Sequence, residues 1–152
     1  MTLKLFRAAW FLSMLAVLAN LLYVYASLPE VINLGEDGVE PYSVGRAYSV
    51  GRETFFYAAM IFIGIGNLIV YLFSRNLTPS EDFRIWIHGL VITINIFFIV
   101  GMSFITLFNS AEKYDFERLR FIIYSSVGLV VLWAIGWPIY LWGKKLLSKQ
   151  TV

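Results

Sequence analysis

The segment Ile85–Phe108, "IWIHGLVITINIFFIVGMSFITLF", contains no Asp, Glu, Lys or Arg. It does not alternate between apolar and polar residues as a half-buried strand does, and it is longer than an ordinary buried helix. A helix of about 20 apolar residues crosses the roughly 30 Å hydrocarbon core of a bilayer. Because lipid offers no hydrogen-bond partners, the backbone there has to be satisfied by a helix. The segment therefore predicts a membrane-spanning helix.

Three further apolar segments have the same character. The whole chain of 152 residues is 59% apolar and only 14% charged, and its charges are confined to a few stretches. We expect an all-α integral membrane protein with one domain over residues 1–152 and no linker. Its four transmembrane helices are predicted at about residues 8–26, 55–73, 85–108 and 121–142.

The first apolar segment has a second interpretation. Lys4 and Arg7 precede it, and Val24-Tyr25-Ala26 is similar to the cleavage site of a secretory signal peptide. The apolar stretch is, however, longer than the usual core of a signal peptide. We therefore expect a retained transmembrane helix.

The basic residues predict the orientation of the four helices. If both termini are cytoplasmic, the inner side carries seven Lys or Arg residues and two acids, and the outer side carries five Lys or Arg residues and eight acids. Positive residues collect on the cytoplasmic side of membrane proteins. We expect an up-down-up-down bundle in the cell inner membrane, with the N and C termini cytoplasmic and an outer loop at residues 27–54.

The outer loop contains a short repeat. Tyr42-Ser43-Val44-Gly45-Arg46 returns six residues later as Tyr48-Ser49-Val50-Gly51-Arg52. An even period places matching residues on the same side of an extended segment, so a β-hairpin arm is conceivable. Tyr42, Arg46, Tyr48 and Arg52 are then candidates for contact with a partner or with lipid headgroups. The competing interpretation is a duplication tolerated in a surface loop.

The connection between the second and third spans contains a helix start signal. Thr78 is predicted as the N-cap, with Pro79 at the first helical position and Glu81 completing a capping box. The fourth helix is expected to begin near Asp115.

Small and polar residues form a stripe on the first span, because their spacing of four, three and four places them on one helix face. Such stripes permit close helix approach, so they are candidates for contact with a partner: Ala9, Ser13, Ala16 and Asn20. Asparagines lie midway along three spans, at Asn20, Asn67 and Asn95. We expect them to make interhelical hydrogen bonds, with a polar ligand pocket as the alternative.

His88 is the one histidine of the chain, which has no cysteine. A hydrogen-bonded interfacial histidine is the favoured interpretation, and a proton relay or a haem- or quinone-binding role is the alternative. No other cofactor, metal site or catalytic constellation is predicted. The absence of charged residues within the spans counts against an ion-coupled transporter, and the absence of long basic arms counts against nucleic-acid binding.

Aromatic residues gather near the inner end of the fourth span, with Trp86 at the matching depth of the third. They are Trp133, Trp137, Tyr140 and Trp142. Tryptophan and tyrosine are enriched at membrane interfaces. We therefore expect an aromatic belt and bound phospholipids, with a quinone or chromophore site as the alternative.

The first span and the segment after it, "SLPEVINLGEDGVEPYSVGR", resemble a domain of Sdp-type immunity proteins, which are small bacterial membrane proteins. The matching positions, which cover about a third of the chain, are Leu28-Pro29, Val31-Ile32, Gly38, Tyr42 and Arg46. Asn33 and Leu34 stand where that motif has a second proline and a histidine. The resemblance implies a bacterial inner-membrane protein concerned with immunity or envelope stress.

Packing stripes, interfacial aromatics and a long outer loop, without catalytic residues, favour a non-catalytic accessory subunit of a larger bacterial inner-membrane complex. Other membrane protein subunits and phospholipids are the expected partners. The alternative is a stand-alone immunity or envelope-stress protein that recognises a toxin or peptide through residues 27–54.

Overall fold

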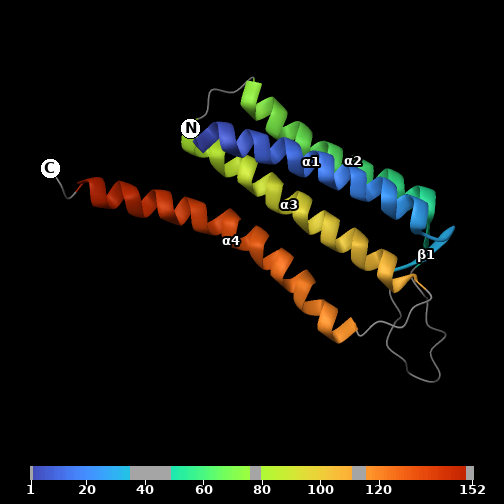
Figure 1. The fold of residues 1–152 in the computed structure, drawn as a ribbon. Coiled ribbons are helices and arrows are strands. Elements are labelled where there is room, and N and C mark those ends of the chain that lie inside the picture. The colour runs from blue at the N-terminus through green and yellow to red at the C-terminus, as the bar shows by residue number, and fades with distance from the viewer. Residues whose placement is uncertain (1, 35–48, 76–79, 111–115, 150–152) are drawn as a thin grey trace.

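The computed structural model describes residues 2–34, 49–75, 80–110 and 116–149. These contain four helices, α1 (Thr2–Ser27), α2 (Arg52–Arg75), α3 (Glu81–Phe108) and α4 (Phe116–Lys149). Each is long and apolar enough to span a bilayer. Successive helices run in opposite directions, and α1 begins at the same end of the molecule where α4 finishes (Figure 1). The predicted four-helix, up-and-down arrangement is confirmed.

The helices extend beyond the predicted apolar segments. The 8–26 segment lies within α1, and the other three lie within α2, α3 and α4. The added turns contain charged and polar residues that are good helix formers, so the helix continues past the point where hydropathy falls. The fourth helix begins at Phe116, beside the predicted Asp115.

The start of α3 differs from the prediction. Ser80 is the N-cap, and its hydroxyl accepts a hydrogen bond from the Phe83 backbone N–H at 3.4 Å. The predicted cap, Thr78, and Pro79 lie outside the described residues. Ser80 has a non-helical backbone conformation, which places Glu81 in the first turn rather than at the third helical position of a capping box. Serine serves as an N-cap as well as threonine does, and the prediction chose the wrong one.

The central helix of the molecule is α3, which contacts each of the other helices. Its most extensive contacts are with α1, whose buried residues recur every three or four positions: Val17, Leu21 and Val24. Ile63 of α2 and Met102 of α3 complete this core. The first helix is thus part of the packed core.

Two short strands cover one end of this core. β1 (Val31–Asn33) pairs with β2 (Ser49–Gly51) in antiparallel register, with Ile32 opposite Val50. Ile32 is fully buried against the end of the helical core. The strand β2 is part of the second copy of the repeat, so that part of the repeat is extended. The first copy, at residues 42–46, lies outside the described residues.

The contact between α3 and α4 depends on a glycine. The Trp133 indole of α4 lies so close to Gly89 of α3 that a Cβ at this position would overlap the ring. The ring is held there because its Nε1–H donates to the Trp86 carbonyl of α3 at 2.9 Å. Gly89 therefore leaves the space that the Trp133 ring occupies between these two helices.

Gly89→Ala is expected to lower the free energy of unfolding by about 1–3 kcal/mol, the usual cost of an overpacked interior. The extra methyl group displaces the Trp133 ring and lengthens its hydrogen bond. The midpoint of unfolding by sodium dodecyl sulfate, followed by tryptophan fluorescence, measures the effect. Gly101→Ala is the matched control on the same helix, because a Cβ there meets no atom within 4 Å. Equal midpoints for the two variants would contradict the argument.

Candidate functional site

A polar cluster joins three helices midway along their length. Trp10 of α1 donates its indole N–H to the Asn67 side-chain oxygen of α2 at 2.9 Å. Asn67 and Asn95 of α3 exchange hydrogen bonds between their amide groups at 3.2 and 3.3 Å. The Asn95 amide also donates to the Ser13 hydroxyl at 3.0 Å. Both asparagines are almost completely buried.

The cluster satisfies its own hydrogen-bonding groups. The Asn67 amide nitrogen donates to the Ile63 carbonyl, one turn back, as well as to Asn95. Ser13 in turn donates to the Trp10 carbonyl. Amides, hydroxyls and indoles do not titrate near neutral pH, so the cluster offers binding and positioning but no acid or base. The expectation of interhelical hydrogen bonds is confirmed for Asn67 and Asn95.

A second polar contact lies further along α1 and α3. Asn20 accepts from the Ser103 hydroxyl at 3.3 Å and donates to the Ile99 carbonyl at 3.4 Å. It is thus the third interhelical asparagine. The two contacts place polar links between α1 and α3 at two separate heights.

His88 lies near the other end of α3, with only 1% of its surface exposed. Its Nδ1 is 2.6 Å from the Arg84 carbonyl, which can only accept, so Nδ1 carries a hydrogen. Its Nε2 lies 3.4 Å from the Ser74 hydroxyl of α2. The Trp10 ring packs against the imidazole nearly at a right angle, with 5.7 Å between the ring centroids. Both ring nitrogens therefore have neighbours within the chain, which fits the favoured interpretation of a hydrogen-bonded histidine.

His88 is still the first residue to consider for a cofactor, because imidazole is a common ligand. Among the described residues, no group of three or more His, Asp or Glu side chains could hold a metal ion. A ligand at His88 would have to displace the Ser74 hydroxyl or the Trp10 ring.

Tryptophans connect α3 to α4 by hydrogen bonds to backbone carbonyls. Trp133 and Trp137, one turn apart on α4, donate to the carbonyls of Trp86 and Asp82, which are one turn apart on α3. In the opposite direction, Trp86 donates to the Ala134 carbonyl of α4 at 3.3 Å. This pairing fixes the antiparallel register of the two helices.

The Trp86 bond has a specific cause. In an α-helix the carbonyl of residue 134 would accept from the backbone N–H of residue 138. Residue 138 is proline and has no N–H. The Ala134 carbonyl is thus left without its helical partner, and the Trp86 indole supplies one. Sequence analysis recognised these tryptophans as an interfacial belt and missed this contact, although the position four residues before Pro138 was the available signal.

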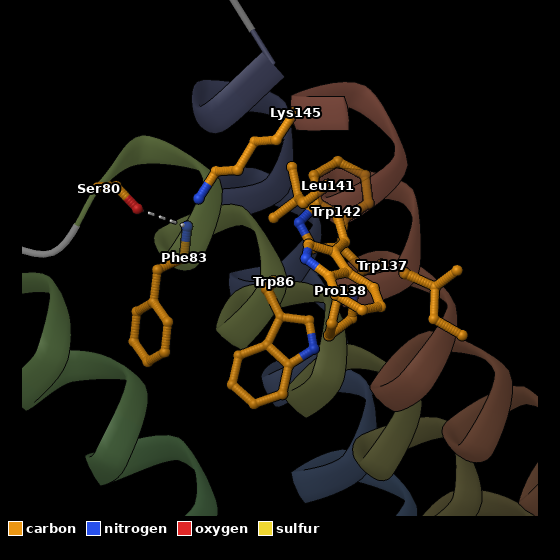
Figure 2. Close-up of a pocket in the computed structure, with 9 residues that line it drawn as sticks. Ser80, Phe83, Trp86, Trp137, Pro138, Leu141, Trp142 and Lys145 are labelled. Atoms are coloured by element: carbon orange, nitrogen blue, oxygen red, sulfur yellow. Dashed lines mark hydrogen bonds between the residues drawn. The ribbon is translucent and has the colours of Figure 1, made fainter. Parts of the chain in front are cut away.

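A groove of about 660 Å³ opens beside these tryptophans, between the start of α3 and the end of α4. We call it the tryptophan groove. Figure 2 shows its aromatic walls and Lys145, whose side chain extends toward Ser80 and Phe83. Its lining residues are Ser80, Phe83, Trp86, Trp137, Pro138, Ile139, Leu141, Trp142 and Lys145.

At the opposite end of the molecule, an asparagine links α3 to the strands. Asn109, the C-cap of α3, accepts from the Asn33 backbone N–H at 2.8 Å and donates to the Asn33 carbonyl at 3.0 Å. Its side-chain amide thus pairs with β1 as a neighbouring strand would. This contact was also not predicted from the sequence, because an asparagine near a helix end is usually interpreted as a cap.

The candidate partner-contact residues lie in different settings. Ser13 and Asn20 bond to α3 within the chain, Ala9 is half-buried and Ala16 is exposed. Arg52 donates to the Leu28 carbonyl at 3.1 Å, and its guanidinium lies over the Tyr25 ring. The remaining candidates, Tyr42, Arg46 and Tyr48, lie outside the described residues.

The chain matches no family model, no curated protein and no solved structure. Its function therefore has to be argued from its own residues.

Asn67→Leu and Asn95→Leu are each expected to destabilise the protein, because each removes the two hydrogen bonds that join the amides. The double variant is expected to lose less than the sum of the two, with a coupling of about 0.6–2 kcal/mol, as for other buried interhelical hydrogen bonds. The free energy of unfolding in mixed micelles is measured for the wild type, the two single variants and the double variant. Asn20→Leu combined with Asn67→Leu is the control, and its effects should add. Additivity in both cycles would rule out the amide pair.

Trp86→Phe is expected to cost about 1–3 kcal/mol, because it leaves the Ala134 carbonyl unsatisfied. The same change should cost less in a Pro138→Ala background, where residue 138 regains a backbone N–H that can reach that carbonyl. The lost packing of the indole cancels in this comparison. Trp137→Phe is the control, since Pro138 does not affect its acceptor on α3. An unchanged cost of Trp86→Phe in both backgrounds would contradict the argument.

Proposed function

We propose that this chain is a non-catalytic subunit of a larger bacterial inner-membrane complex, with four transmembrane helices and both termini cytoplasmic. The support for the membrane is the length and apolar character of each helix. The support for the orientation is the basic bias of the end that carries both termini. The support for an accessory role comes from the contacts of the polar residues and from the exposed surface of α4.

The polar side chains midway along the helices are engaged in contacts between those helices. Asn67, Asn95, Asn20 and Ser13 all bond within the chain. In proteins that move ions or carry out reactions in the membrane, buried polar and charged groups face a pathway or a substrate. Here the same positions hold the helices together, which favours a structural role.

The observation that carries the proposal is the uncovered surface of α4. Only 6% of the residues in its most apolar stretch are buried, compared with 22% in the corresponding stretch of α3. It packs mainly on α3, and large side chains such as Leu132 and Tyr124 are directed outward, 72% and 69% exposed. Lipid alone can cover such a face, but packing of small and large side chains against a second protein is what drives helix association in membranes.

A photoreactive phenylalanine derivative at Leu132 is expected to form a discrete adduct with a second membrane protein when cells are illuminated. The same amino acid at Val17, which is fully buried between helices, is the control and should react only within the chain. Adducts are identified by mass spectrometry after gentle solubilisation, which should also return the partner in fixed proportion. If Leu132 yields only lipid adducts and the chain purifies alone, the subunit proposal fails and the stand-alone immunity role becomes the better one.

A further inference from the structure

The tryptophan groove has walls that are already in position. Trp86 and Trp137 form part of its lining, and both are fixed by hydrogen bonds, to the carbonyls of Ala134 and Asp82. Trp137 also stacks on Trp133 at a ring separation of 5.3 Å. A preformed groove loses little freedom when it is filled, and its volume of about 660 Å³ lies within the range of small-molecule sites.

The lining combines a long apolar surface with one cationic end. Phe83, Pro138, Leu141 and Trp142 add apolar walls to the two fixed indoles, while Lys145 stands at the rim. Figure 2 shows the Lys145 amine on the side of the groove where α3 begins. The Ser80 hydroxyl lies at the same rim and is the cap of that helix. The groove therefore suits a molecule with an apolar tail and an anionic head.

The depth of the groove fits the same molecule. Lys145 lies just past the uncharged segment 121–143 of α4, where the hydrocarbon region is expected to give way to headgroups. Lys144 precedes it, and Lys4 and Arg7 lie at the corresponding end of α1. Basic pockets between helices on the cytoplasmic side are typical sites for anionic lipid headgroups.

We propose that the tryptophan groove binds an anionic phospholipid of the cytoplasmic leaflet, with an acyl chain along Trp86, Trp137 and Trp142 and the phosphate beside Lys145. This inference rests on the membrane location proposed above. It names one lipid class and one site. The general contact of a membrane protein with lipid is specific for neither.

Brominated acyl chains test the proposal, because bromine quenches tryptophan fluorescence on close contact. Three of the five tryptophans of the chain line the groove. The protein is reconstituted in phosphatidylcholine vesicles, and brominated phosphatidylglycerol or brominated phosphatidylcholine is added in increasing proportion. We expect half-maximal quenching at about a fivefold lower proportion of the anionic lipid, the effect of one lysine near a headgroup.

Lys145→Gln is expected to remove most of this preference. Lys4→Gln is the matched control, since it deletes an exposed basic residue at the same end of the molecule but outside the groove lining. Trp142→Phe should reduce the quenchable fluorescence, because it removes one of the three indoles that line the groove. The wild-type preference should persist when inorganic phosphate replaces chloride at equal ionic strength.

Three results would overturn the lipid site. They are equal quenching by the two lipids, equal loss of preference in the two lysine variants, and loss of the wild-type preference in inorganic phosphate. The last would indicate a simple anion site. Alkaline extraction of the same vesicles separates this failure from that of the membrane location, because a protein that remains in the vesicles without lipid preference contradicts the groove proposal alone.

Discussion

An amide buried among apolar helices has to find its hydrogen-bond partners inside the protein, and this requirement fixes how three of the helices fit together. Asn67 and Asn95 pair with each other, while Trp10 and Ser13 supply the remaining bonds from α1. A slip of one helix by one turn, about 5.4 Å, would leave several of these groups unpaired. Apolar contacts alone tolerate such a slip far better, because one leucine-rich face packs much like the next. The amides therefore select the register in which the cores around Met102 and Val91 are packed.

The fourth helix is positioned by different chemistry. Between α3 and α4, tryptophan indoles donate to backbone carbonyls, and Gly89 leaves room for the Trp133 ring that makes one of these bonds. Pro138 is part of the same arrangement, because it creates the carbonyl that Trp86 satisfies. A proline in a transmembrane helix is tolerated where a neighbour re-satisfies the freed carbonyl. The side chain that does so here comes from α3 and not from α4 itself, so the proline also ties the two helices together.

The fold was predictable from sequence because the solvent imposes it. Uncharged segments such as 85–108 are long enough that only a helix satisfies their backbone, and the four helices were found on this ground alone. Their ends were less predictable, since hydropathy falls before the helix stops and since Ser80 and Thr78 are both good caps. Within the candidate site, the asparagines were recognised because polar residues in apolar segments are costly. The hydrogen bond between Asn67 and Trp10 was not recognised, because it joins residues 57 positions apart. Periodicity on one helix says nothing about which residues of another helix face it.

The amide cluster and the tryptophan hydrogen bonds have different consequences for function. The amide cluster joins α1, α2 and α3 to one another through Trp10, Asn67 and Asn95. The tryptophan bonds hold α4 at residues 133–137, close to the middle of Phe116–Lys149, and nearer its N-terminal end α3 and α4 leave a smaller apolar gap lined by Ile99, Phe104 and Ile122. A helix that is held near its middle and exposed along most of its length takes part of its position from whatever lies against it. In the proposed complex, a neighbouring subunit on the outer face of α4 and a phospholipid in the tryptophan groove would both act on this one helix.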